Sequence, residues 1–223
     1  MDTIRPIRSF ILRQGRLTKS QKNAIDNFGK DYLVDFSPSQ VDLNKIFHKK
    51  KEIIFEIGFG MGGATHQIIK QNTMFNYLAS DVHLPGIGNL IKLCNDDSLQ
   101  NIKIIQHDAT EILKTMMPDN FLAGINIFFP DPWHKKRHNK RRLINQDTLQ
   151  LFSQKLKPGS TLHIATDWEP YAIEIIDLIE RSSDFSFLNE DFHIRPIIRP
   201  ETKYESRGTR LGHQVWDILA ARG

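Results

Sequence analysis

The chain has 223 residues, of which 39% are hydrophobic, so it is long enough to bury the core of one domain. No apolar run approaches the roughly 20 residues that cross a bilayer, and the first segment, MDTIRPIRSF, lacks the apolar stretch of a secretion signal. We therefore expect no membrane partner and a cytoplasmic location. The net charge of +4 is mild, and the single cysteine, Cys94, excludes an internal disulfide and has the surroundings of a small apolar helix residue rather than of a nucleophile.

Residues 1–40 are predicted to form a basic N-terminal extension that is partly flexible, because their hydrophobic periodicity is weak. The stretch from Met1 to Lys22 holds six Lys and Arg against one acid, which gives a net charge of +5. Such a run is typical either of a solvated tail or of a surface that binds a polyanion. Residues 41–223 are predicted to form the folded domain.

In that domain, apolar runs of strand length alternate with segments of helical period. The pairs, in chain order, are EIIFEIGFG with ATHQIIKQ, FNYLASDVH with GNLIKLCND, IKIIQHD with TEILKTM, GINIFFPD with RRLINQDTLQLFSQKL, and STLHIATD with YAIEIIDLIERS. Five successive strand and helix units predict an α/β fold, with a parallel sheet covered by helices on both faces. Near the end of the chain, DFSFLNE and HQVWDILAA are predicted to pair as a hairpin on the sheet edge.

The first predicted strand ends in a glycine-rich turn, FEIGFGMGG. Gly58, Gly60 and Gly62 match the pattern GxGxG, while Gly58, Gly60 and Gly63 match GxGxxG. Both patterns provide a tight turn from strand to helix and let a ligand approach the backbone closely. The glycines alone therefore leave two classes of cofactor open.

Acidic residues lie at or just after the ends of the first four predicted strands: Glu56, Asp81, Asp108 and Asp131. In a doubly wound sheet these ends form the ligand crevice, so the four carboxylates should converge. They would repel the pyrophosphate of a dinucleotide, but they suit the sulfonium and ammonium groups of S-adenosylmethionine. One partly screened charge pair near 4 Å is worth about 4 kcal/mol, which favours S-adenosylmethionine, with Asp81 at the ribose diol and Asp108 at the adenine amino group.

Each acid also has an explanation that needs no ligand. Asp108 and Glu111 have the spacing of a capping box, and Asp131 before Pro132 can start a turn. Asp81 and Asp167 can each cap the helix that follows. Taken together the acids favour a ligand, because helix caps have no reason to follow the glycine turn strand after strand.

The fourth strand runs into FFPDPWHKKRHNKRR, in which residues 134–142 hold six Lys and Arg and no acid, a charge of +6. Subtracting both basic runs from the net charge leaves −7 on the rest of the chain. His134 and His138 have the i, i+4 spacing of a zinc pair, but their cationic neighbours would repel a metal ion, so no metal is expected. Trp133 either stacks on a nucleoside or packs against the end of the sheet.

These motifs resemble those of the bacterial tRNA (guanine-N7)-methyltransferases of the TrmB type over nearly the whole chain. The resemblance rests on IRSFILRQGRLTKSQ, FEIGFGMGG, SDVHLPGIG, HDATEIL, FFPDPWHKKRHNKRR, ATDWEPYA and RPETKYESRGTRLGHQVWD. Family members usually carry Glu where this chain has Asp81, so the geometry of the ribose contact differs. The resemblance implies a class I S-adenosylmethionine-dependent methyltransferase (Rossmann-like) fold, with a seven-stranded, mostly parallel sheet and an antiparallel last strand.

The resemblance also implies roles for individual residues, with Asp131 as the catalytic position. The implied cofactor contacts are Glu56, Gly58, Gly60, Gly62, Asp81, Asp108 and Asp131. The implied contacts to the substrate, either to the tRNA or to its target guanine, are Lys135, Asp167, Thr202, Lys203, Tyr204 and Glu205. The tRNA backbone contacts that we expect from the charge pattern are Arg13, Arg16, Arg137, Lys140, Arg141 and Arg142.

The implied reaction is methyl transfer from S-adenosylmethionine to N7 of a guanosine in the variable loop, at tRNA position 46, by a monomer or a homodimer. Two alternatives remain at this point: methylation of another RNA, and a nicotinamide-dependent (NAD) oxidoreductase suggested by GxGxxG.

Overall fold

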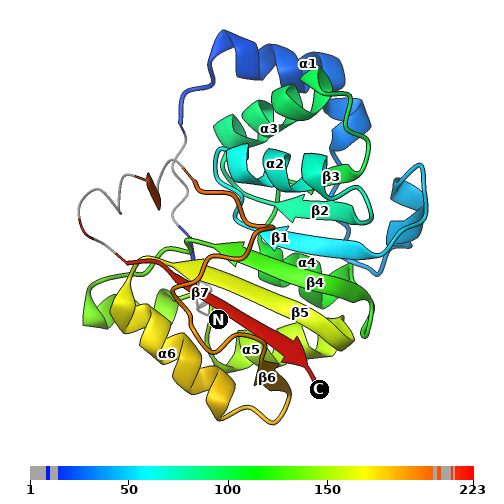
Figure 1. Cartoon of the computed structure of the whole chain (residues 1–223). Helices are drawn as coiled ribbons and strands as arrows, with labels where there is room; N and C mark the ends of the chain where they lie inside the picture. Colours follow the sequence, from blue (N-terminus) through cyan, green and yellow to red (C-terminus); the bar gives the residue numbers. More distant parts are fainter. Residues whose placement is uncertain (1–8, 11–14, 203–204, 207–211, 213) are drawn as a thin grey trace, which may run out of the picture.

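The computed structural model describes residues 9–10, 15–202, 205–206, 212 and 214–223, and a seven-stranded sheet lies at its centre (Figure 1). The strand order is β3-β2-β1-β4-β5-β7-β6. The parallel strands are β1 (Ile53–Ile57), β2 (Asn76–Ser80), β3 (Ile102–Ile105), β4 (Leu122–Phe128) and β5 (Leu156–Thr166). The last strand, β7 (Trp216–Arg222), runs antiparallel between β5 and β6 (Phe185–Phe187), which confirms the predicted fold class and the predicted terminal hairpin.

Helices cover both faces of the sheet (Figure 1). One face carries α1 (Lys19–Tyr32), α2 (Gly63–Gln71) and α3 (Leu84–Asp96), and the other carries α4 (Ala109–Thr115), α5 (Gln146–Lys155) and α6 (Glu169–Glu180). Successive strand residues point to opposite faces, so Ile54 packs under the first set of helices, whereas Phe55 packs under the second. The strands are apolar on both sides because both sides are covered.

Helix α1 lies inside the segment predicted as a basic extension. It starts at a reciprocal capping box between Thr18 and Gln21 and packs closely on α3, where a Cβ atom on Gly88 would lie 2.8 Å from the backbone oxygen of Gln21. After the helix, the amide of Val34 donates to the carbonyl of Ile104 at 2.9 Å. Part of the extension is therefore ordered against the sheet, while the division of the chain at residue 40 stays a prediction.

The basic segment that follows β4 is not part of α5, although its sequence continues smoothly into that helix. It forms a short 3-10 helix, η2 (Lys136–Arg141), and α5 starts only at Gln146. Asn145 sets this start, because its side chain accepts from the amide of Thr148 at 3.1 Å and the hydroxyl of Thr148 accepts from the amide of Asn145 at 3.0 Å. The basic residues therefore lie on a loop and a short turn beside the strand ends. None of the helices that the structure describes is long and apolar enough to pass through a membrane.

Candidate active site

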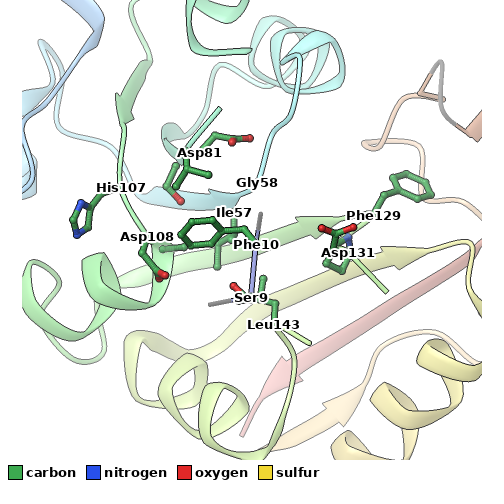
Figure 2. A pocket seen from close by; sticks show the side chains of 14 residues that line it. Ser9, Phe10, Ile57, Gly58, Asp81, His107, Asp108, Phe129, Asp131 and Leu143 are labelled. Atoms are coloured by element: carbon green, nitrogen blue, oxygen red, sulfur yellow. The ribbon is translucent and has the colours of Figure 1, made fainter. Parts of the chain in front are cut away.

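A cavity of about 250 Å³ lies at the carboxyl ends of the parallel strands (Figure 2). The strand register aligns these ends, because Ile57 of β1 pairs with Ser80 of β2 and with Ile127 of β4. The residues that follow the strands are therefore neighbours in space. Of the four acids that the sequence places at strand ends, Asp81, Asp108 and Asp131 line this cavity.

The glycine turn after β1 starts at the cavity, which Gly58 lines. Gly58 and Gly60 have φ angles of 74° and 58°, a left-handed conformation that favours glycine. A Cβ atom on either residue would meet no atom within 4 Å, so the backbone of the turn faces open space that a ligand can enter. Gly62 differs from these two residues, because a Cβ atom there would lie 2.7 Å from Cβ of Leu90. Its small size therefore serves the packing of α2 on α3.

Asp81 joins the glycine turn to the end of β2. Its Oδ2 accepts from the amide of Gly60 and its Oδ1 accepts from the amide of His83, both at 2.8 Å. Burial raises the pKa of its carboxyl group, although these amides act against the rise. The N-cap of α3 is His83, without a side-chain cap, so the alternative in which Asp81 caps that helix is wrong.

Asp108 is a helix cap that also lines the cavity. It is the N-cap of α4, and its Oδ1 accepts from the amide of Thr110 at 2.8 Å and from the amide of Glu111 at 3.4 Å. The capping alternative is thus confirmed, although Glu111 does not complete a capping box and instead pairs with His107 at 2.5 Å. All the hydrogen bonds that Asp108 accepts from the described residues go to Oδ1, and the residue still lines the cavity.

Glu56 does not line the cavity. It is 2% exposed and lies behind the glycine turn, where its Oε1 accepts from the hydroxyl of Thr65 at 2.7 Å. Among the described residues, its Oε2 has no hydrogen-bond partner. Burial, partly offset by the bond from Thr65, raises the pKa of this carboxyl to about 7. The expectation that four acids converge on one cavity therefore needs correction to three, because the side chain of Glu56 points into the interior.

Asp131 lies on the loop after β4, is exposed and lines the cavity (Figure 2). The neighbouring Trp133 is 9% exposed and has a left-handed φ of 47°. Its indole Nε1 donates to the carbonyl of Ser9 at 3.0 Å, and the guanidinium of Arg141 lies 3.9 Å from the centre of the ring. Of the two alternatives for Trp133, the structure therefore supports packing rather than an exposed stacking surface.

Arg142 is predicted from the charge pattern to contact tRNA phosphates, and the structure corrects this expectation. The residue is 5% exposed. Its Nε donates to the carbonyl of Pro132 at 2.9 Å, and its Nη1 pairs with Glu174 of α6. A buried guanidinium needs such partners, because an unpaired charge in the interior is costly. Arg142 therefore fixes the Asp131 loop to α6 and does not face solvent.

The other predicted phosphate contacts lie elsewhere. Arg16, Arg137 and Lys140 are exposed, as is Lys135, which the resemblance assigns to the substrate. Arg141 is half-buried over Trp133, and Arg13 lies outside the described residues. Loss of hydration at the ring lowers the pKa of His138, and the neighbouring charges of Arg137, Arg141, Lys135 and Lys140 lower it further.

The C-terminal residues assigned to the substrate are only partly described. Thr202 and Glu205 bond reciprocally: the amide of Glu205 donates to the Thr202 hydroxyl at 2.9 Å, and the amide of Thr202 donates to Glu205 Oε2 at 3.3 Å. Lys203 and Tyr204 lie outside the described residues. Asp167 follows β5 but does not line the cavity, and the N-cap of α6 is Trp168, so the capping alternative for Asp167 is wrong.

The predicted site residues do not include Ser9 and Phe10, which also line the cavity. Figure 2 shows the Phe10 ring among the labelled acids, near Asp108 and Gly58. The weak hydrophobic periodicity of the N-terminal residues does not predict their place at the cavity. Ser9 is held there by the hydrogen bond from Trp133, which lies 124 positions later in the sequence. In the part of the chain that the structure describes, no three His, Cys, Asp or Glu side chains group in a way that would hold a metal ion.

Comparison with known proteins identifies the family. A family model described as "Putative methyltransferase" matches residues 50–218. A tRNA (guanine-N(7)-)-methyltransferase from Chromobacterium violaceum is 47% identical over 218 residues, covering 98% of this chain and 96% of that protein. The chain belongs to the tRNA (guanine-N(7)-)-methyltransferase family. A family member from Francisella philomiragia is 43% identical, covering 98% of this chain and 96% of its own.

Solved structures share the fold of this methyltransferase at low sequence identity. The [4+2]-cyclase SpnF matches with a TM-score of 0.54 at 12% identity, covering 77% of this chain and 74% of its own. An antibiotic-related methyltransferase matches with a TM-score of 0.50 at 12% identity, covering 94% of this chain and 97% of its own. At such identity the likeness shows the fold alone, and it agrees with the strand order described above.

Proposed function

We propose that this enzyme transfers a methyl group from S-adenosylmethionine to N7 of a guanosine in tRNA, in the variable loop at tRNA position 46. The observation that carries the proposal is that Asp81, Asp108 and Asp131 lie around one cavity. The exposed basic residues Arg137 and Lys140 follow Asp131 closely in the sequence. A cationic donor suits the acids, and a polyanionic acceptor suits the basic residues. The relatives are named as methyltransferases of tRNA guanine N7, and on that basis we take a tRNA guanine as the acceptor.

The cavity fits S-adenosylmethionine in its chemistry. Gly58 and Gly60 leave open backbone where a Cβ atom would otherwise project, so the methionine part of the cofactor can lie against the turn. Each carboxylate oxygen of Asp81 accepts one amide and keeps a lone pair for a ribose hydroxyl. Asp108 keeps Oδ2 for the adenine amino group, because its cap bonds go to Oδ1. The bound cofactor supplies a methyl group on a positively charged sulfur.

The reaction does not require a general base. N7 of guanine carries an in-plane lone pair and no proton at neutral pH, so the enzyme must align the reacting atoms and exclude water. Positive charge leaves the sulfur and develops on the purine as the methyl group moves. The carboxylate of Asp131 stabilises this charge, and it does so best when its loop is fixed in advance. Pro132 restricts the backbone of that loop, and Arg142 holds the carbonyl of Pro132.

Acceptor binding is divided between the base and the backbone of the tRNA. We assign Asp167 to the N1 and amino hydrogens of the guanine, since a carboxylate accepts from both. Following the resemblance, we also assign the Thr202–Glu205 segment to the target guanosine. Lys135 serves the guanine edge or a nearby phosphate. Arg16, Arg137 and Lys140 serve phosphates, because they are exposed. A tRNA substrate also favours a cytoplasmic location.

Incubation with labelled S-adenosylmethionine and an unmodified tRNA transcript tests this function, followed by chemical cleavage at 7-methylguanosine. We expect label in the tRNA and one cleavage site in the variable loop. A matched transcript with adenosine at that position should stay unlabelled. Cleavage elsewhere would overturn the choice of nucleotide, and absence of label would overturn the function. Calorimetry with S-adenosylhomocysteine and with NADH separates the oxidoreductase alternative, since only the first should bind.

A further inference from the structure

Arg199 is the largest fully buried side chain among the described residues, and it does not line the cavity. Its guanidinium forms two paired sets of hydrogen bonds. Nε and Nη2 donate to the two carboxylate oxygens of Asp217 at 2.6 and 2.5 Å. Nη1 and Nη2 donate to the two oxygens of Glu205 at 2.6 and 3.0 Å. One buried cation therefore bridges the helical turn that carries Glu205 and the sheet strand that carries Asp217.

The bridge also reaches the strand that leads to Asp131. Asp217 lies in β7 and shares its Oδ1 with Nε2 of His163 in β5, at 2.8 Å. The guanidinium carbon of Arg199 lies 6.0 Å from the ring centre of Phe128 and 5.5 Å from that of Phe129. Phe129 stands two residues before Asp131, and its amide donates to the carbonyl of Ala165 in β5 at 2.7 Å. The cluster thus contacts β5 through His163, the end of β4 through Phe128 and Phe129, and the helical turn that carries Glu205.

The geometry of the cluster favours a positioning role over simple stabilisation. A buried ion pair is weak evidence for stability, since apolar residues of similar size often do as well. What the planar guanidinium adds is orientation, because each carboxylate is held by two parallel hydrogen bonds. Through Glu205 this orientation extends to Thr202, to which Glu205 bonds reciprocally. One guanidinium therefore holds Glu205 directly and Thr202 through Glu205.

We propose that Arg199 is a positioning residue for the acceptor base, because its guanidinium fixes Glu205 and Thr202 relative to the end of β4 that carries Asp131. The inference rests on the proposed function, in which this segment contacts the target guanosine. Arg199 does not line the cofactor cavity. Its loss should therefore misplace the base and leave the cofactor in position. A displacement on the order of 1 Å in a reacting group can reduce the rate about 100-fold.

The test compares Arg199→Lys with Arg195→Lys, in full-length enzyme with saturating unmodified tRNA. Lysine keeps the charge at position 199, but it cannot make the paired hydrogen bonds to Asp217 and to Glu205 at the same time. We expect kcat for methyl transfer to fall about 10- to 100-fold in Arg199→Lys, with little change in the KM for tRNA, since phosphate contacts hold the tRNA. The affinity for S-adenosylhomocysteine should be unchanged. Arg195 is the matched control, because its side chain is 39% exposed and makes a single 3.4 Å contact to Glu205.

A second variant guards against a failure of Arg199→Lys to fold. Glu205→Gln keeps the shape of the side chain and weakens the same paired bonds, so it should show the same fall in kcat. The double variant should lose little more than either single one, because the two residues act as a unit. Wild-type kcat in Arg199→Lys, or a parallel loss of transfer and of S-adenosylhomocysteine binding, would overturn the proposal. Failure of the wild-type enzyme to methylate tRNA would instead overturn the function itself.

Discussion

The carboxylates at the strand ends share a sequence pattern and differ in their surroundings. Glu56 is buried and has one hydrogen-bond partner for one oxygen, whereas Asp81 accepts amides on both oxygens. Asp108 uses one oxygen for a helix cap, and Asp131 is exposed on the wall of the cavity. Since the surroundings of a carboxylate set its affinity for a proton and for a cation, the four residues should respond differently to substitution.

For Asp131, we expect Asp131→Asn to reduce the single-turnover rate of methyl transfer by about 100-fold or more, because a fixed charge near the reacting atoms is removed. Asparagine keeps the shape of the side chain, so the fold should be retained. S-Adenosylhomocysteine carries no charge at its sulfur and should still bind, as measured by calorimetry. A rate close to that of the wild-type enzyme would remove Asp131 from the chemical step.

For Glu56, the stability of the fold should depend on pH. Burial raises the pKa of this carboxyl from 4.5 to about 7, so the folded state holds the proton more tightly than the unfolded chain. The free energy of unfolding should therefore fall as pH rises from about 4.5 to about 7, by roughly 3 kcal/mol from this group. Glu56→Gln should flatten that slope in urea unfolding, and the exposed control Glu111→Gln should not. An unchanged slope in Glu56→Gln would refute the assignment.

At the scale of elements, the sequence predicts the strands and the helices that follow them, because buried parallel strands are continuously apolar. It does not predict which residue of a charge run turns inward. Arg142 belongs to the same basic block as Arg137, but its partner Glu174 lies 32 positions later, on α6. Helix α1 escaped prediction for a related reason: it has few apolar positions of its own and is stabilised by packing against α3.

The exposed residues of the basic segment after β4 should contribute to tRNA binding. Charge reversal of the exposed Arg137 and Lys140 should weaken tRNA binding and make the slope of log affinity against log salt shallower by roughly 1.5 in the double variant. Cofactor binding should survive, since neither residue lines the cavity. Reversal of Lys45, whose side chain is 83% exposed on another element, is the matched control. Identical salt slopes for the double variant and the wild-type enzyme would contradict the assignment.

At the scale of the whole molecule, acidic and basic residues occupy different parts of the chain. Away from the two basic runs the chain carries a net charge of −7, and its acids include those of the cavity. The cavity and its three acids, Asp81, Asp108 and Asp131, could be predicted because strand ends meet at one edge of a parallel sheet. The contact between Ser9 and Trp133 could not, since it joins residues 124 positions apart. The Arg199 cluster could not either, since no local pattern shows that this arginine is buried between Glu205 and Asp217, which lie 6 and 18 positions away.

The central claim is that the lone pair of guanine N7 attacks the methyl group directly, in a cavity that supplies charge and alignment but no base. A tRNA transcript with 7-deazaguanosine at the variable-loop position tests it, because carbon replaces the attacking nitrogen and the rest of the base is kept. With labelled S-adenosylmethionine and enzyme in excess, we expect this tRNA to bind like the unmodified transcript and to take up no label. Incorporation of label into the 7-deazaguanosine tRNA would contradict the account.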